Sequence, residues 1–235
     1  MLVDLTHRSE EEEIMDDLDS SGEIIDQTLK ELEIINRLLG GNQISVKALV
    51  QLLQQSAKKE ITLLDLGCGG GDILMLMADW ARKHNYTIHF IGIDANPSIV
   101  AYARNNCKAY PEISFQCLNI FSAEYRELDC DVVHASLFTH HFTQEQLFDL
   151  FQIFKQQAQL GIIINDLHRH TLAYYSIKWL TKFFSKSPMV QHDAALSVAR
   201  SFRRDDIKAI MRSVQIEDYE LRWKWAFRWK WVIET

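Results

Sequence analysis

The sequence lacks several features that mark common protein classes. Its four cysteines form no C-x-x-C pair, and no cysteine–histidine cluster has zinc-finger spacing. No apolar run is long enough to span a bilayer, and no basic start followed by an apolar run suggests a signal peptide. Internal repeats and Pro/Gly-rich linkers are also missing. We therefore expect a cytoplasmic protein without stable membrane insertion.

A basic excess is missing as well. The formal net charge is −7, which argues against a general nucleic-acid binder, so we expect no nucleic-acid partner. The acidic residues gather in residues 1–33, where twelve Asp and Glu stand against Arg8 and Lys30. We interpret this run as a solvated face or a flexible arm, in preference to a site for a basic partner.

The periodicity of apolar residues predicts the order of helices and strands. Helical spacing occurs at residues 23–39 and 44–57, ahead of a region where short apolar runs alternate with helical segments. The strands of that region are expected at residues 61–67, 88–94, 113–119, 130–136 and 160–166, and its helices at residues 72–84, 97–108 and 143–159. Such alternation predicts a parallel sheet covered on both faces.

The last third of the sequence departs from this alternation. Residues 171–212 predict two or three helices, the first of them amphipathic with a lysine stripe. In residues 221–233 every odd position is apolar and most even positions are basic, which indicates strand. One strand of that length is unusual, so we predict an antiparallel hairpin with a turn near Ala226. The tryptophans at its odd positions should pack one sheet face on helices, and its basic positions should lie at a sheet edge or face solvent.

The strongest motif is the stretch ITLLDLGCGGGDI at residues 61–73, where a strand runs into glycines and then a helix. Glycine suits backbone that adopts unusual dihedrals or approaches a ligand closely. In doubly wound sheets, ligands bind beyond the carboxyl ends of strands, where this loop lies. The third glycine is one residue early for the dinucleotide motif G-x-G-x-x-G, and Asp72 would face a pyrophosphate unfavourably. A nicotinamide-dependent oxidoreductase is therefore the less favoured enzyme class.

The pattern D-x-G-x-G-x-G resembles the first motif of class I S-adenosylmethionine-dependent methyltransferases. The resemblance covers about residues 60–166. It implies an α/β fold: a doubly wound, seven-stranded, mostly parallel sheet with a C-terminal antiparallel hairpin and helical caps. We expect residues 1–57 to form an N-terminal helical cap. Residues 58–235 would then be a Rossmann-like methyltransferase domain, with a helical lid insert at about residues 171–200.

The resemblance also implies the cofactor and its binding residues. Asp94 ends the second strand, 23 residues after Gly71, where a carboxylate can accept hydrogen bonds from both ribose hydroxyls. Asn119 ends the third strand, where the family often has an acid or amide facing the adenine. We expect S-adenosylmethionine to be bound by ten residues: Asp65, Gly67, Cys68, Gly69, Gly71, Asp94, Ala95, Asn119, Ile120 and Ser136.

Histidines follow the fourth and fifth strands, in SLFTHHF (residues 136–142) and NDLHRH (residues 165–170). The first segment resembles an LHHF-like segment of small-molecule methyltransferases, including those of ubiquinone and menaquinone biosynthesis. The N/D-P-P-Y motif of enzymes that methylate adenine or glutamine nitrogen is absent. His140, His141 and His168 are candidates for the base that deprotonates an acceptor, although each could instead cap a helix or bind a carbonyl. Carboxylates are too few nearby for us to expect a metal.

The main hypothesis is thus an S-adenosylmethionine-dependent methyltransferase with a small aromatic or polyketide-like acceptor. O-methylation is favoured, and C-methylation of a quinol-like ring comes next. The alternative from another class is a non-catalytic methyltransferase-like protein that binds the cofactor or serves as a scaffold. The amphipathic helix at residues 171–186 is interpreted as a lid, with contact to a membrane surface as the less favoured alternative.

Overall fold

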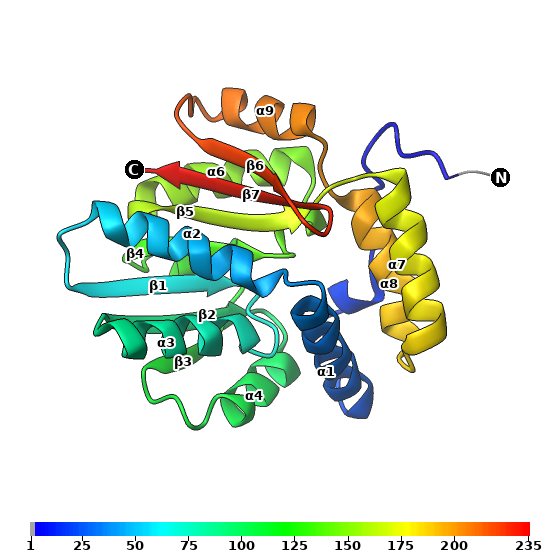
Figure 1. Ribbon diagram of the computed structural model, residues 1–235, viewed down its shortest axis with the longest axis horizontal. Helices are drawn as coiled ribbons and strands as arrows, with labels where there is room; N and C mark the ends of the chain where they lie inside the picture. The colour runs from blue at the N-terminus through cyan, green and yellow to red at the C-terminus, as the bar shows by residue number, and fades with distance from the viewer. Residues whose placement is uncertain (1–2) are drawn as a thin grey trace.

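A single mixed sheet organises the protein, whose computed structural model describes residues 3–235 (Figure 1). Its strand order is β3-β2-β1-β4-β5-β7-β6. The first five strands are parallel, and β7 runs antiparallel to both of its neighbours. The strands are β1 (Glu60–Leu66), β2 (Thr87–Asp94), β3 (Ile113–Cys117), β4 (Cys130–Ser136), β5 (Ala158–Leu167), β6 (Glu220–Lys224) and β7 (Arg228–Glu234).

Several helices begin at residues whose side chains satisfy free backbone N–H groups. Asn96 accepts a hydrogen bond from the backbone N–H of Ser98 (2.8 Å), and Thr143 and Ser187 cap their helices in the same way. The helices are α1 (Glu23–Leu38), α2 (Asn42–Gln55), α3 (Asp72–His84), α4 (Pro97–Asn106), α5 (Ala123–Arg126), α6 (Gln144–Gln157), α7 (Thr171–Phe184), α8 (Pro188–Arg200) and α9 (Arg204–Ser213). Two short 3-10 helices are η1 (Ile14–Asp16) and η2 (Thr139–His141).

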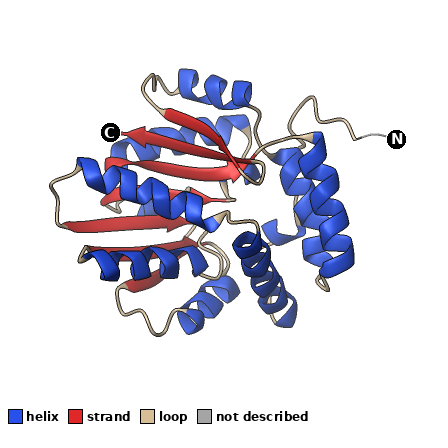
Figure 2. Cartoon of the chain, viewed as in Figure 1, coloured by secondary structure: helices blue, strands red, loops and turns tan. Residues whose placement is uncertain are grey.

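Helices cover both faces of the sheet, and each face has its own hydrophobic core (Figure 2). On one face α2, α3 and α4 pack against residues such as Leu63 and Phe90. On the other face α5, α6 and α9 pack against residues such as Leu64 and Val133. Alternate residues of the central strands therefore point into opposite cores, which explains their nearly continuous apolar sequences.

A third group of helices lies beyond the carboxyl ends of the parallel strands. It consists of α1, η1, α7 and α8, and α7 packs side by side with α8 (Figure 1). The predicted cap at residues 1–57 is thus divided in space. Its first helix, α1, belongs to this third group, whereas α2 packs on the sheet through buried residues such as Leu49 and Leu52.

The predicted fold class is confirmed, including all seven strands and the C-terminal hairpin. The turn of the hairpin lies between Lys224 and Arg228, around the predicted position of Ala226. The predicted helices agree with α1–α4, α6 and α7 to within a few residues, and the two or three helices predicted within residues 171–212 are α7, α8 and α9. The short helix α5 and the 3-10 helices were not predicted.

The predicted solvent exposure of the hairpin's basic residues is wrong for β7. Arg228 and Lys230 are buried, because β7 lies inside the sheet and α2 covers the face to which they point. The Nη2 of Arg228 donates to Asn36 Oδ1 (2.8 Å), and the Nζ of Lys230 donates to Gln51 and to Glu220. Buried cations need such partners because isolated charges are costly to desolvate.

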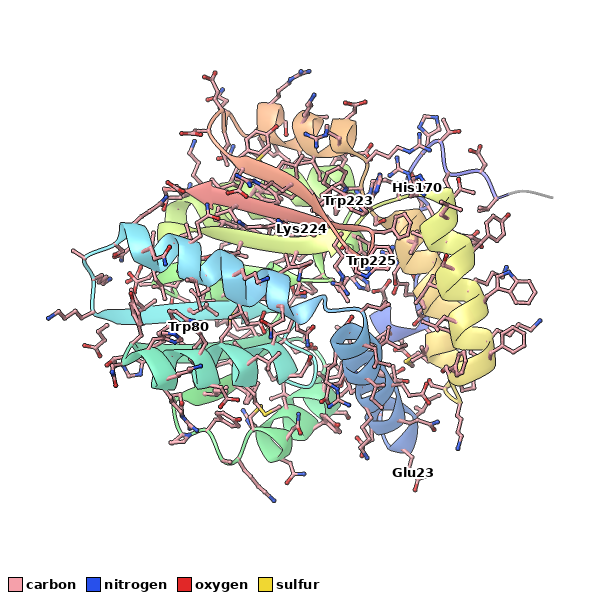
Figure 3. The ribbon with its side chains drawn as sticks, in the orientation of Figure 1. Glu23, Trp80, His170, Trp223, Lys224 and Trp225 are labelled. Carbon is pink, nitrogen blue, oxygen red and sulfur yellow. The ribbon has the colours of Figure 1, made fainter. Side chains whose placement is uncertain are left out.

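The expected packing of the four hairpin tryptophans is confirmed only in part. Trp229 and Trp231 on β7 are buried. Trp223 and Trp225 are exposed, because β6 is the edge strand and the turn projects toward the start of α7, where His170 lies (Figure 3). Among residues 3–235, no helix combines the length and apolar character needed to cross a membrane.

Candidate active site

A cavity of about 590 Å³ opens where the carboxyl ends of the parallel strands meet the third group of helices. The switch in strand order between β1 and β4 lies beside it, which is the position where doubly wound sheets bind ligands. Nine of the ten predicted cofactor residues line its wall: Asp65, Gly67, Cys68, Gly69, Asp94, Ala95, Asn119, Ile120 and Ser136. Gly71, the tenth, is not part of the wall and directly precedes α3.

The glycine loop between β1 and α3 is held against β2 by its backbone. The N–H groups of Gly67 and Cys68 both donate to the carbonyl of Ile93, at 2.9 and 3.1 Å. Gly67 has a φ of +64°, and a Cβ at this position would overlap the ring of Phe138. A larger residue would therefore be strained and would displace an aromatic ring of the cavity wall.

Asp94 has the surroundings of a ribose-binding carboxylate. It ends β2 and lines the cavity, and its Oδ1 accepts the N–H of Asn96 at 3.0 Å. Burial raises the pKa of Asp94 to about 6, although backbone N–H groups of Asn96, Gly69 and Ala95 oppose the rise. With this pKa the carboxylate is mostly ionised at neutral pH, and an ionised carboxylate can accept hydrogen bonds from hydroxyl groups.

Asp65 is oriented by a buried polar network that reaches from β1 to α2. Its Oδ1 lies 2.6 Å from His134 Nδ1 on β4, and His134 Nε2 lies 2.8 Å from Ser45 Oγ. Asn165 donates to Ser45 Oγ and to the carbonyl of Gly41, both at 3.0 Å. The network joins three neighbouring strands to α2 and gives the Asp65 carboxylate one direction at the cavity wall. Nothing in the local sequence around Ser45 indicated this role.

The adjacent histidines of η2 have different surroundings. His140 is buried and is not part of the cavity wall. Its Nδ1 lies 2.7 Å from Asp166 Oδ1, and its Nε2 lies 3.5 Å from Glu13 Oε1. Burial lowers the pKa of His140, but the charges and hydrogen bonds of Asp166 and Glu13 outweigh it and raise the pKa to about 9. At neutral pH His140 is therefore a cation between two carboxylates.

His141 lines the cavity. Its Nδ1 lies 2.5 Å from Asp16 Oδ1, while the other oxygen of Asp16 accepts from Arg200 Nη1 at 2.6 Å. Arg200 also donates to the carbonyl of His141 at 2.6 Å. Because Asp16 accepts the Nδ1–H, the second nitrogen of His141 is left as a hydrogen-bond acceptor when the ring is neutral.

The structure does not bring His168 together with the other two histidines. It packs beside Trp229 and His170, with ring centroids 4.9 and 5.3 Å away, and it is not part of the cavity wall. Burial, together with the positive charges of His170 and nearby arginines, lowers its pKa to about 4.

The interpretation of the acidic N-terminal run as a solvated face or arm is wrong for Glu13 and Asp16. Glu13 is buried against His140, and Asp16 binds His141 and Arg200. The segment is held in place by Asp193 on α8, which accepts the backbone N–H groups of residues 14 and 15 at 2.9 and 3.0 Å. Glu10, Glu11 and Glu12 are exposed, as expected.

One group of side chains in the described part of the chain could hold a metal ion. Ligand atoms of Glu13, His140 and His141 lie within 4.8 Å of one another. However, the proton on His140 and the guanidinium of Arg200, whose Nε is 3.9 Å from Glu13, already balance the carboxylate charge. A divalent ion would have to displace that proton, so the cluster fits an ion-pair network better than a metal site.

Comparison with known proteins agrees with this geometry. A family model described as "Methyltransferase domain" matches residues 57–219. The chain belongs to this family, and it is a class I S-adenosylmethionine-dependent methyltransferase. No curated protein matches the sequence significantly.

Solved structures show the same fold at low sequence identity. Human N-acetylserotonin methyltransferase with S-adenosylmethionine superposes with a TM-score of 0.65 and 15% identity, over 92% of this chain and 56% of that one. The plantazolicin methyltransferase with S-adenosylhomocysteine superposes with a TM-score of 0.62 and 17% identity, over 90% of this chain and 99% of that one. An O-methyltransferase family protein from Burkholderia thailandensis superposes with a TM-score of 0.64 and 16% identity, over 90% of this chain and 59% of that one.

The first prediction concerns Asp94. Asp94→Ala should weaken S-adenosylhomocysteine binding by about 100-fold, because two hydrogen bonds to a charged group are lost. Calorimetric titration measures this, and Asp149→Ala, at an exposed acid outside the cavity, is the matched control. Affinity of the parent protein should also fall as pH drops below about 6, when Asp94 becomes protonated. An unchanged affinity in Asp94→Ala would contradict the ribose assignment.

The second prediction concerns His140. Its folded-state pKa lies above the ordinary value of 6.5, so its contribution to stability is complete below pH 6.5 and is lost as pH rises through about 9. The unfolding free energy, measured with urea, should decline by a few kcal/mol across this window. His140→Gln should remove the decline and lower stability by about 3 kcal/mol at pH 6.5, because Asp166 loses its buried partner. His89→Gln, at an exposed histidine, should keep the decline.

Proposed function

We propose that the protein transfers a methyl group from S-adenosylmethionine to a hydroxyl of a small aromatic acceptor, with His141 as the base. The observation that carries the proposal is that His141 lines the same cavity as Asp94 and the glycine loop. C-methylation of a quinol-like ring is the second possibility. His140 and His168, the other two candidates, lie outside the cavity wall and are not the base in this proposal.

An aromatic cluster beside His141 supports an aromatic acceptor. Phe142 meets Phe138 and Phe121 edge to face, with ring centroids 5.0 and 5.6 Å apart, and the Phe138 ring lies 6.3 Å from that of His141. All four side chains line the cavity, together with Met15 of the N-terminal segment. Flat apolar molecules pack well against edge-to-face aromatic pairs, which favours a phenol over a polar aliphatic alcohol.

In this proposal the residues of the chain position the cofactor and the acceptor, and one of them accepts a proton. When bound, S-adenosylmethionine provides a methyl group on a sulfonium, which is a good leaving group. Asp94 and the glycine loop would hold the nucleoside, and the phenylalanines would orient the acceptor toward the methyl group. This positioning of the two reactants supplies much of the rate. His141 would take the hydroxyl proton, and Asp16 would stabilise the imidazolium that forms.

The helices beyond the sheet edge would enclose the acceptor. The cavity wall includes Leu29 and Leu32 of α1, Asp16 of η1 and Arg200 of α8. We propose that α1, η1 and α8 form the cap that excludes water, within the predicted cap at residues 1–57 and the predicted lid at residues 171–200. The domain division at residue 57, the cytoplasmic location and the absence of a nucleic-acid partner stay predictions.

The third prediction tests His141. His141→Ala should lower turnover by about 100-fold or more while S-adenosylhomocysteine affinity changes little, because the base acts on the acceptor and not on the cofactor. Turnover is measured as release of S-adenosylhomocysteine across a panel of phenols and quinols. Asp16→Asn should lower turnover less, since it keeps the shape of the partner and removes only its charge.

His168→Ala is the control, because that residue lies outside the cavity. Full activity of His141→Ala on every accepted substrate would disprove the assignment of the base. Cofactor binding by the parent protein without turnover on any acceptor would favour the scaffold alternative.

The fourth prediction concerns metals. Added chelator should leave turnover unchanged, because Glu13 is already paired with the cations His140 and Arg200 and needs no divalent ion. The measurement is turnover in the presence of EDTA and after dialysis against it. A loss of activity that Mg²⁺ or Zn²⁺ restores would show that the cluster at Glu13 binds a metal.

A further inference from the structure

Helix α7 presents an apolar surface that no described element covers. It packs on α8 through its opposite side, where Ala173 and Thr181 are buried. Its outer side chains extend away from the body of the protein (Figure 3). The most exposed are Leu172 (64%), Trp179 (55%), Phe183 (69%) and Phe184 (80%). Large apolar side chains grouped in this way are unusual on a solvated helix and mark an interaction site.

Three of these residues form a continuous stripe. Leu172, Trp179 and Phe183 are separated by seven and four residues, so they fall on one side of the helix. The rings of Trp179 and Phe183 stack, with centroids 5.6 Å apart and an interplanar angle of 14°. No residue of α7 lines the cavity, so the stripe is not explained by the acceptor site.

The charge of α7 is opposite to that of the whole protein. The chain has a formal net charge of −7, yet α7 contains two lysines and no acidic residue. The lysines extend over the aromatic rings beside them. The Nζ of Lys178 is 5.6 Å from the centroid of Tyr174, and that of Lys182 is 5.6 Å from the centroid of Trp179. Long cationic side chains beside aromatic rings are typical of helices that lie in a bilayer interface.

A second copy of this chain is a poorer occupant of the stripe. In a twofold symmetric contact, α7 would meet α7. The contact would bring Lys178 and Lys182 of one copy close to those of the other, and α7 has no acid to neutralise them. Lipid phosphates provide the negative charge that the helix itself lacks.

We propose that α7 is the docking surface for an anionic lipid bilayer. The helix lies in the plane of the interface, with Leu172, Trp179 and Phe183 among the acyl chains and the two lysines at the phosphate level. Because the helix is amphipathic and short, the contact is peripheral and reversible.

The test is co-sedimentation of the full chain with vesicles. Vesicles of equal parts phosphatidylcholine and phosphatidylglycerol should bind the protein, and phosphatidylcholine alone should bind it at least about tenfold more weakly. Added salt should weaken the binding, because it screens the lysine charges. The double variant Trp179→Ser/Phe183→Ser should abolish binding, and Lys178→Glu/Lys182→Glu should weaken it by about tenfold or more.

Matched controls are Phe148→Ser and Lys155→Glu, at exposed positions of α6, which should bind as the parent does. Each variant should also bind S-adenosylhomocysteine like the parent, which shows that it is folded. Trp179→Phe offers a measurement that needs no disruptive change: vesicles should shift the tryptophan emission of the parent to shorter wavelength and shift that of this variant less.

Three outcomes would overturn the proposal. The first is no binding to the anionic vesicles by the folded parent. The second is binding that both α7 double variants retain. The third is a dimer that Trp179→Ser/Phe183→Ser dissociates in the absence of any vesicle binding, which would assign the stripe to a second copy.

Discussion

The buried pair of His140 and Asp166 holds the cavity in its observed shape. Asp166 lies near the end of β5 and His140 lies in η2, after β4, so the pair joins two neighbouring strands at their carboxyl ends. Asp166 also accepts the Oγ1–H of Thr139 at 2.6 Å and the backbone N–H of His140 at 3.1 Å. These bonds fix η2, and with it the next residue, His141, at the cavity wall. Loss of either partner would leave an unpaired charge in the interior and would strongly destabilise the folded protein.

The same cluster attaches the N-terminal segment to the sheet. Glu13 reaches His140, Asp16 reaches His141, and Arg200 of α8 contacts both carboxylates. Arg8 adds hydrogen bonds from its Nη2 to the carbonyls of His140 and Phe142, at 2.9 and 2.8 Å. The N-terminal segment at the cavity is thus held by charge-assisted hydrogen bonds, in addition to small apolar clusters such as that of Leu5, Leu196 and Ala199. The sheet below it is held by apolar packing.

The residues that lie at the carboxyl edge of the sheet could be predicted from the sequence. Asp65, Asp94, Asn119 and Ser136 each end or follow a strand, and parallel strands bring their carboxyl ends together whatever the helices between them contain. The glycine loop was also predictable, because a φ of +64° at Gly67 and the close approach of Phe138 both require glycine. Periodicity gave no information on which of two adjacent histidines faces the cavity, since η2 is a single irregular turn.

The sequence by itself therefore determined the strands, the longer helices and the sheet edge at which the cavity opens, because local periodicity and glycine conformations are short-range properties. Only the tertiary structure decided which residues surround His141 at the cavity wall. Asp16 and His141 are 125 positions apart, and no short-range pattern connects them. Burial of Lys230 was likewise decided by the position of β7 inside the sheet, where both faces are covered and an alternating pattern no longer means a solvent-facing side. Charged residues that are distant in sequence form such pairs because an isolated buried charge is costly, and in the interior only another charged or polar side chain can offset that cost.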